Sequence, residues 1–285
     1  MWLTNSSVGR KVIMSVTGLF LILFVTFHVL MNAVAIISPE GYDAVCHFLG
    51  ANWYALAATV VLAAGFLIHI VVSFWITLQN RKARGNDAYA VNKRPKQVEW
   101  ASQNMLVLGI IIVCFLVVHL IQFWYKMQWQ ELIGSEYVAD GVAIHPANGQ
   151  FFLYYAFKDW WTLVIYLIGF AALWFHMSHG FWSAFQSLGV NNNIWMKRLR
   201  ATAMGWATIV CLLFAVEGVV FTLRANCPEY VNNVIAAAEC PQVQGTCTEI
   251  VAVECAGTSN ACADCTSECN NACEDCTCPN DSVNK

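Results

Sequence analysis

Five long apolar runs constrain the fold of this chain more than any other feature. They cover residues 12–37, 53–78, 103–125, 160–186 and 203–223. Each has about 20 residues or more, which at 1.5 Å per helical residue crosses the roughly 30 Å hydrocarbon core of a bilayer. Only 12% of the 285 residues are charged, against about a quarter in soluble domains. The sequence therefore predicts an all-α fold, an integral membrane bundle of five helices.

Basic residues are distributed unevenly over the segments that connect these runs. The N-terminus, the second loop and the fourth loop carry Arg10, Lys11, Arg81, Lys82, Arg84, Lys93, Arg94, Lys96, Lys197, Arg198 and Arg200. The opposite side carries only Lys126, Lys158, Arg224 and Lys285. Because an excess of Lys and Arg marks the cytoplasmic loops of membrane proteins, we expect the N-terminus inside and the C-terminus outside.

Five of the seven histidines lie within the apolar runs, where burying an ionisable side chain is costly in free energy. The five are His28, His69, His119, His176 and His179. Ionisable residues at membrane depth are candidates for function. A single buried histidine is more often a helix-to-helix hydrogen bond, but here each of the first four runs carries at least one. This distribution favours a shared cofactor site.

The depth of each histidine sorts four of them into two pairs. His28 and His119 lie 16–17 residues from the inner ends of their helices, which places both at roughly 24–25 Å. His69 and His176 lie 10–11 residues from the inner ends, at roughly 15–16 Å. Helix tilt changes these values by only a few Å. We therefore expect an outer pair, His28 with His119, and an inner pair, His69 with His176.

Two facing histidines in an apolar bundle suit the axial positions of a b-type haem. The chain also has 12 Trp and 17 Phe, which suit the walls of such a cofactor site. A zinc or di-iron site would draw its ligands to one depth and usually include carboxylates, whereas Glu217 is the only acidic residue well inside a run. The sequence thus predicts two haem b groups enclosed by the bundle. The alternative is a haem-free transporter whose histidines relay protons.

Short motifs surround these histidines in a fixed order along the chain. They are Gly9-Arg10-Lys11, Ser15-Val16-Thr17-Gly18, Phe27-His28-Val29-Leu30 with Asn32, Gly65-Phe66-Leu67-Ile68-His69-Ile70, His119-Leu120-Ile121-Gln122-Phe123, and His176-Met177-Ser178-His179-Gly180-Phe181-Trp182-Ser183. In their order and spacing, residues 5–224 resemble the cytochrome b subunit of the five-helix, two-haem succinate:quinone oxidoreductases. That group includes the menaquinol:fumarate reductases.

The resemblance implies a function and several further site residues. It implies a subunit of a bacterial cytoplasmic membrane that passes electrons between a quinone, menaquinone in many members, and flavoprotein and iron-sulfur subunits on the inner side, with no nucleic-acid partner. It selects His176, four residues before Gly180, as the inner ligand, and leaves His179 a packing or supporting role. It also implies that Ser15 contacts a haem propionate; Trp100 and Gln103 are further options. Trp174 stands where some members carry a proton-conducting Glu.

The resemblance to the menaquinone-using members implies a quinone site near the outer haem, and such a site would need proton-exchanging groups. The outer loop between the first two runs offers Glu40, Asp43 and His47, although a solvated loop residue is the favoured interpretation of each one taken alone. The chain has no motif for dicarboxylate chemistry, so that reaction would belong to the partner subunits. An alternative assignment is the dihaem quinone-reactive anchor of a formate dehydrogenase, hydrogenase or nitrate reductase.

The C-terminal segment, residues 225–285, differs from the preceding membrane region, residues 1–224. It holds ten of the thirteen cysteines: Cys227, Cys240, Cys247, Cys255, Cys262, Cys265, Cys269, Cys273, Cys276 and Cys278. With many acidic residues and few aromatics, such a segment cannot build a hydrophobic core. We expect an irregular extracytoplasmic tail closed by disulfides. The Cys-x-x-Cys pairs at 262–265 and 273–276 leave a metal site as the alternative.

Overall fold

Five long apolar helices form the protein, as the computed structural model shows for the residues it describes, 6–84 and 99–239. They are α2 (Ser7–Ile37), α4 (Trp53–Arg84), α5 (Trp100–His119) with the π-helical turn η1 (Leu120–Trp124), α8 (Trp160–Ser187) and α9 (Asn193–Ala225). Each is long and apolar enough to cross a membrane. The prediction of an all-α fold with five helices that could each span a membrane is thereby confirmed.

Two of these helices begin well before the apolar runs that predicted them. Helix α2 begins at Ser7, where the Ser6 side chain accepts a hydrogen bond from the Gly9 amide over 2.9 Å. Helix α9 begins at Asn193, and Asn192 caps it in the same way. Such caps satisfy amide groups that have no partner within the helix. Counting apolar residues predicts the segment that would cross the hydrocarbon core, whereas the capping residues show where the helical backbone begins.

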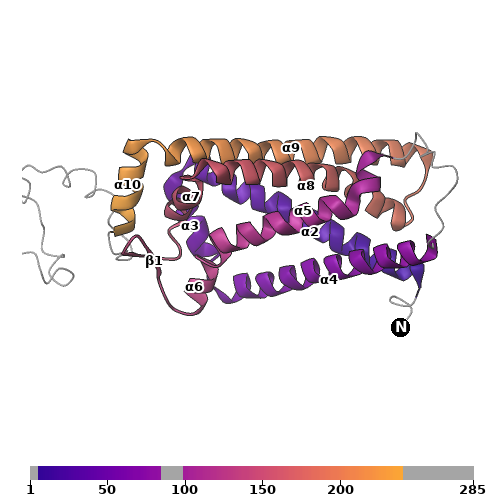
Figure 1. Ribbon diagram of the computed structural model, residues 1–285, viewed down its shortest axis with the longest axis horizontal. Coiled ribbons are helices and arrows are strands. Elements are labelled where there is room, and N and C mark those ends of the chain that lie inside the picture. The colour runs from indigo at the N-terminus through magenta and orange to yellow at the C-terminus, as the bar shows by residue number, and fades with distance from the viewer. Residues whose placement is uncertain (1–5, 85–98, 240–285) are drawn as a thin grey trace, which may run out of the picture. The chain divides into compact units, whose positions relative to one another are not determined.

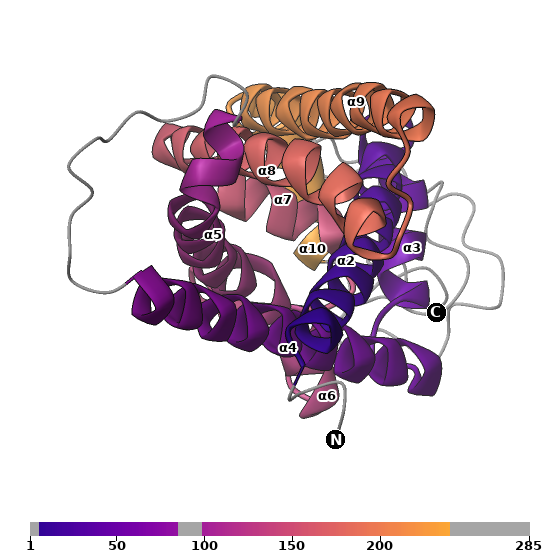
Figure 2. The same ribbon diagram turned by 90° about the vertical axis from the view of Figure 1, so that its right-hand side faces the viewer.

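The four histidine-bearing helices surround a common axis, and α9 lies outside them. Helix α2 packs on α4 and α8, α8 packs on α5, and α5 approaches α4, which closes the ring. Helix α9 runs beside α8 and also contacts α2, as the view along the bundle shows (Figure 2). Side chains of α2, α4, α5 and α8 therefore point towards one another, and α9 covers the ring from one side.

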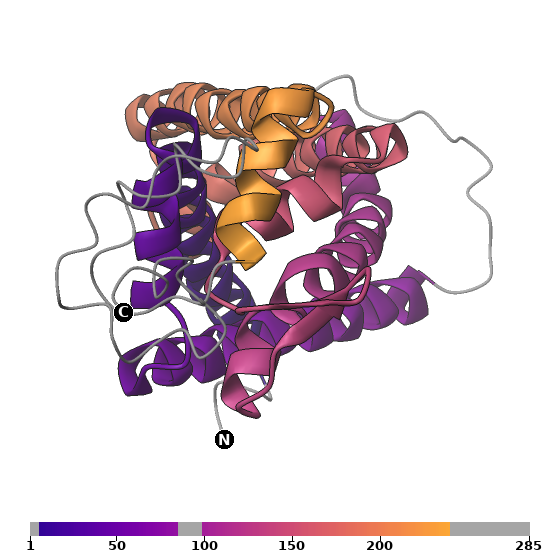
Figure 3. The ribbon, with the colours of Figure 1, turned by 90° about the vertical axis from the view of Figure 1, so that its left-hand side faces the viewer.

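Short elements cover one end of the bundle, which we call the capped end (Figures 1 and 3). They are α3 (Pro39–Phe48), α6 (Gln128–Leu132), β1 (Tyr137–Ala139), β2 (Val142–Ile144), α7 (Gly149–Phe157) and α10 (Pro228–Glu239). Strands β1 and β2 form an antiparallel hairpin with Val138 opposite Ala143. Its turn uses Asp140 and Gly141, both at positive φ, a conformation that glycine and Asp tolerate best. The opposite end, where α2 and α9 begin, is called the basic end.

The helix α10 corrects one expectation for the C-terminal segment. Residues 228–239 are helical, although the sequence predicted an irregular tail from residue 225. The reason is tertiary packing, because Val234 is 4% exposed and contacts a cluster that includes Ile144 and Phe152. The other cysteine-rich residues, 240–285, lie outside the described part of the chain. So do Lys93, Arg94 and Lys96 of the second loop.

Candidate functional site

The structure brings four histidines together as two facing pairs. The ring centroids of His28 on α2 and His119 on α5 lie 5.8 Å apart, with their planes at 88°. The centroids of His69 on α4 and His176 on α8 lie 6.3 Å apart, at 67°. We call the first the capped-end pair and the second the basic-end pair. These are the pairs that helical depth predicts; whether they bind iron stays a prediction.

The two centroid distances lie at or just below the span of two imidazoles on opposite sides of one metal atom. A metal to imidazole-nitrogen bond of about 2.0–2.1 Å places two such centroids about 6.3 Å apart. Two histidines joined by a direct hydrogen bond would place a ring nitrogen of each within about 3 Å of the other, and no such bond joins either pair among the described residues. The spacing therefore suits a group inserted between the rings.

A hydrogen-bond chain sets the proton position on His119. Its Nδ1 lies 3.3 Å from the Tyr166 hydroxyl, and that hydroxyl donates its own proton to Gln122 Oε1 over 2.9 Å. Because the tyrosine proton is committed, Nδ1 of His119 must be the donor. The hydrogen-bond pattern thus assigns the Nδ1–H tautomer, which leaves the Nε2 lone pair available to a metal. Gln122 is held within η1, and π-helical turns often occur at functional sites.

The basic-end pair repeats this arrangement with a different hydroxyl. Nδ1 of His69 lies 3.1 Å from Thr17 Oγ1, which donates to the Ile13 carbonyl over 2.9 Å. The Thr17 proton is again committed, so His69 carries its proton on Nδ1 and presents Nε2. Nδ1 of His176 is buried and has no hydrogen-bond partner among the described residues. A buried polar atom without a partner is uncommon and indicates a place where an additional group fits.

Aromatic side chains surround the capped-end pair, whereas glycines lie beside the basic-end pair. The capped-end pair is enclosed by aromatic rings: Phe24 stacks on His28 at 5.4 Å, Phe214 lies 6.0 Å from it, and Phe115 and Phe123 flank His119. Such rings exclude water and suit a flat apolar macrocycle.

Glycines lie beside the basic-end pair. A Cβ added at Gly18 would come within 3.3 Å of His69 Cε1, and one at Gly109 within 3.9 Å of His176 Cε1. Each glycine lies about three turns before the capped-end histidine of its own helix. Helices α2 and α5 therefore each supply a histidine to one pair and close backbone approach to the other.

His179 lies apart from the ring pairs, at the basic end. Its Nδ1 is 3.1 Å from Glu99 Oε2, and its ring packs on Trp182 at 4.8 Å. Arg200 also contacts this group, 3.9 Å from Glu99 Oε1 and over the Trp182 ring. The structure thus gives His179 polar and packing partners of its own.

Ser15 and Trp100, two residues suggested for a propionate contact, have partners within the chain. Ser15 is buried, and its hydroxyl donates to the Lys11 carbonyl over 2.9 Å. A propionate carboxylate accepts hydrogen bonds, so Ser15 would have to release this bond in order to donate to it. Trp100 packs its ring on Phe175 at 5.1 Å. A propionate role for either residue stays a prediction, as it does for Gln103.

The three quinone-site candidates all lie on α3, at the capped end. Asp43 accepts one hydrogen bond from the backbone N–H of Gln150 (2.9 Å) and another from the Gln150 side-chain amide (2.8 Å). These two bonds tie α3 to α7. Burial raises the pKa of Asp43, and the bonds from Gln150 partly offset that rise. Glu40 and His47 are exposed, and Glu40 accepts from the Ser38 hydroxyl. Asp43 therefore has a structural function at this end, whatever further role it serves.

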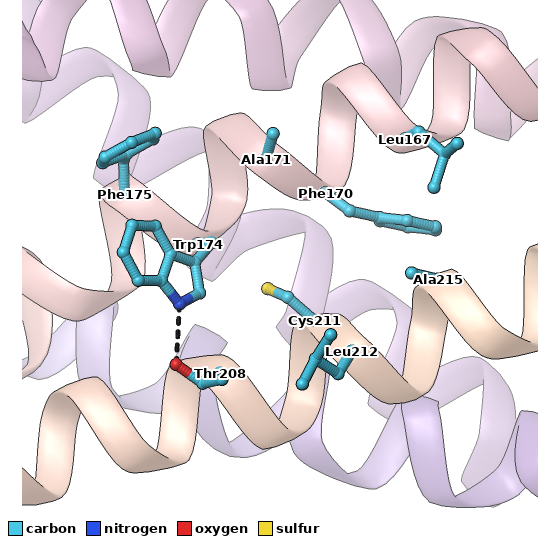
Figure 4. Close-up of a pocket in the computed structure, with 9 residues that line it drawn as sticks. All are labelled: Leu167, Phe170, Ala171, Trp174, Phe175, Thr208, Cys211, Leu212 and Ala215. Carbon is cyan, nitrogen blue, oxygen red and sulfur yellow. Dashed lines mark hydrogen bonds between the residues drawn. The ribbon is translucent and has the colours of Figure 1, made fainter.

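A groove of about 310 Å³ lies between α8 and α9 (Figure 4). Trp174 contributes to its wall and donates its indole N–H to Thr208 Oγ1 over 2.9 Å. The remaining lining residues shown are mostly apolar. Trp174 is therefore directed towards α9, and the groove contains none of the four paired histidines.

Comparison of the chain with family models, curated proteins and solved structures gave no match. The assignment of a function therefore depends on the chemistry of the residues described above. Sequence reasoning did not identify Thr17, Gln122 and Tyr166 as partners of the histidines. A signal was present for Thr17, because it lies eleven residues before His28 and thus on the same face of α2.

Proposed function

We propose that the chain is the membrane-anchor cytochrome b subunit of a succinate dehydrogenase or menaquinol:fumarate reductase. It would hold one haem b at each histidine pair and pass electrons between a quinone and the flavoprotein and iron-sulfur subunits. The observation that supports this most is the pair of facing imidazoles at two depths, each pair with one Nδ1 proton held by a hydroxyl. The flavoprotein and iron-sulfur partners come from the family resemblance.

In this function the chain's own residues would hold the haem iron, orient the ligating rings, keep those rings neutral and exclude water. A bound haem b supplies one-electron transfer between ferric and ferrous iron. The two histidines of each pair would hold the haem iron through ring nitrogens, Nε2 in the case of His119 and His69, and ligation by two histidines would favour electron transfer over oxygen chemistry. Tyr166 and Thr17 orient one ring of each pair and keep it neutral at the coordinating nitrogen. The aromatic wall excludes water, and the two depths provide successive sites along the bundle axis.

The test is a reduced-minus-oxidised absorbance spectrum of the purified protein with a haem count. The proposal expects a low-spin b-type spectrum with two haems per chain, and one haem after His28→Ala. Absence of any b-type band in the wild-type protein would refute the haem assignment and favour a histidine proton relay. Co-purifying subunits decide the complex: a flavoprotein with dicarboxylate activity supports the proposal. A formate dehydrogenase, hydrogenase or nitrate reductase subunit would instead assign the chain to another dihaem anchor.

A further inference from the structure

Glu217 is a buried carboxyl group that the electron-transfer function leaves unused. It lies within the span of α9 and is only 2% exposed. None of the described residues gives its Oε1 a hydrogen bond. An unpartnered carboxyl group in an apolar interior is costly, and a buried acidic group within a membrane span is a functional candidate. A functional role would offset the free-energy cost of burying this carboxyl group.

Glu217 lies one helical turn from a residue that contacts the capped-end pair. Phe214 precedes it by three residues on α9 and places its ring 6.0 Å from the His28 ring. One turn of helix rises about 5.4 Å. The carboxyl group is thus close to the capped-end pair without belonging to it, at roughly 10 Å.

Polar groups connect this region with the capped end. The Tyr42 hydroxyl on α3 donates to Asn32 Oδ1 over 3.1 Å, and the Asn32 amide donates to the His28 carbonyl over 2.9 Å. Burial raises the pKa of Tyr42 well above its usual value, and interactions with Cys46, Asp43 and Glu217 add to that rise. Tyr42 and Glu217 are therefore close enough to interact electrostatically.

Several titratable and charged groups near this part of α9 already have partners within the chain. The guanidinium of Arg224, two turns further along α9, donates to the Ala35 and Ile36 carbonyls and so is engaged at the end of α2. Tyr166 on α8 is committed to Gln122, and Asp43 on α3 to Gln150. Further titratable groups on the elements around this part of α9 are His28 on α2, Cys46 on α3, Tyr154 and Tyr155 on α7, Glu229 and Tyr230 on α10, and Cys211 on α9 itself. None of them forms an ion pair with Glu217 in the described residues.

We propose that Glu217 is a proton-binding site coupled to the redox state of the capped-end histidine pair. The proposal rests on the proposed function, since it requires a haem at that pair. When the site gains one electron from a hydroquinone or a chemical reductant, one proton from water at the capped end binds the Glu217 carboxylate. When the electron leaves, the proton returns. One negative and one positive charge arrive together, so the buried region keeps its net charge.

The size of the coupling follows from the separation of the two sites. Two unit charges about 10 Å apart at an effective dielectric constant of about 20 change a proton affinity by about tenfold. For a one-electron couple, tenfold corresponds to about 59 mV in midpoint potential. The capped-end component should therefore fall by about 59 mV between acidic and alkaline plateaus, while the basic-end component serves as an internal control.

The experiment is a potentiometric titration of both haems in the purified complex over a range of pH, for wild type, Glu217→Gln and Glu99→Gln. Glutamine keeps the shape of glutamate and removes the titration. We expect the pH dependence of one component to be present in wild type, retained in E99Q and lost in E217Q. Retention of the full dependence in E217Q would overturn this proposal and leave the dihaem assignment intact. Absence of haem from the wild-type complex would overturn both.

A second measurement covers the case in which E217Q does not bind haem. The reduced-minus-oxidised infrared difference spectrum of the wild-type complex should show a protonated-carboxyl C=O band that shifts in D₂O. Such a band supports uptake of a proton by a buried carboxyl group. A spectrum without it, from a complex with both haems reduced, would overturn the proposal.

Discussion

Replacing Thr17 by valine tests whether hydroxyl groups prepare the histidines for metal binding. Valine keeps the size of threonine and removes the oxygen that lies 3.1 Å from His69 Nδ1. The His69 N–H then loses its acceptor, which costs about 1–3 kcal/mol for a buried donor. Loss of such an outer partner typically weakens metal binding by about 10–100-fold, or about 1.4–2.8 kcal/mol. The free-energy cost of the lost hydrogen bond and the expected loss of metal-binding free energy therefore agree in size.

The assay is transfer of haem from the purified complex to a haem-free acceptor protein, followed for each site by its spectrum. We expect the basic-end site to lose haem about 10–100-fold more readily in Thr17→Val, with the capped-end site unchanged. The midpoint potential of the basic-end haem should rise, because a less basic imidazole stabilises ferric iron less. The matched control is Thr77→Val on α4, whose hydroxyl bonds only the Ser73 carbonyl among the contacts described. Equal retention of haem by T17V and T77V would refute the reasoning.

Three further predictions concern the histidine pairs and the capped end. Tyr166→Phe should weaken the capped-end haem by about 10-fold or more and leave the basic-end haem in place, as a haem count and redox titration of each site will show. His69→Ala or His176→Ala should remove the basic-end haem, whereas His179→Ala should leave both; loss of a haem in the last variant contradicts the ligand assignment. Burial raises the pKa of the Cys46 thiol to about 12, so its alkylation, measured by peptide mass spectrometry, should increase about tenfold per pH unit across neutral pH. Rapid alkylation at pH 7 would show that the thiol is accessible and ionised.

Helical geometry explains how much of the site the sequence predicted. A helix rises by a fixed amount per residue, so counting from the basic ends placed His28 beside His119 and His69 beside His176. The counting works because a membrane span is nearly straight and must begin and end at the same two surfaces. The number of helices and their approximate positions follow from the same constraint.

The residues that sequence reasoning missed depend on contacts between helices. A threonine within a helix usually bonds the carbonyl four residues before it, and Thr17 does so; only the structure shows that its oxygen also faces His69. The elements of the capped end are short and lack a long periodic pattern, so α7 and α10 were not predicted. Asp43 was noted for its charge, but its two bonds to Gln150 join residues more than 100 positions apart.

The way in which the pairs alternate along the chain has a consequence for biosynthesis. The capped-end pair joins the first and third spans, α2 and α5, while the basic-end pair joins the second and fourth, α4 and α8. A nascent chain that leaves the ribosome therefore completes its capped-end pair when the third span enters the membrane and its basic-end pair one span later. Helix α9 adds no histidine to either pair, although its Phe214 joins the wall beside His28, so the histidines of both pairs are present before α9 arrives. The order of translation thus sets the order in which the two histidine pairs, the proposed haem sites, can form.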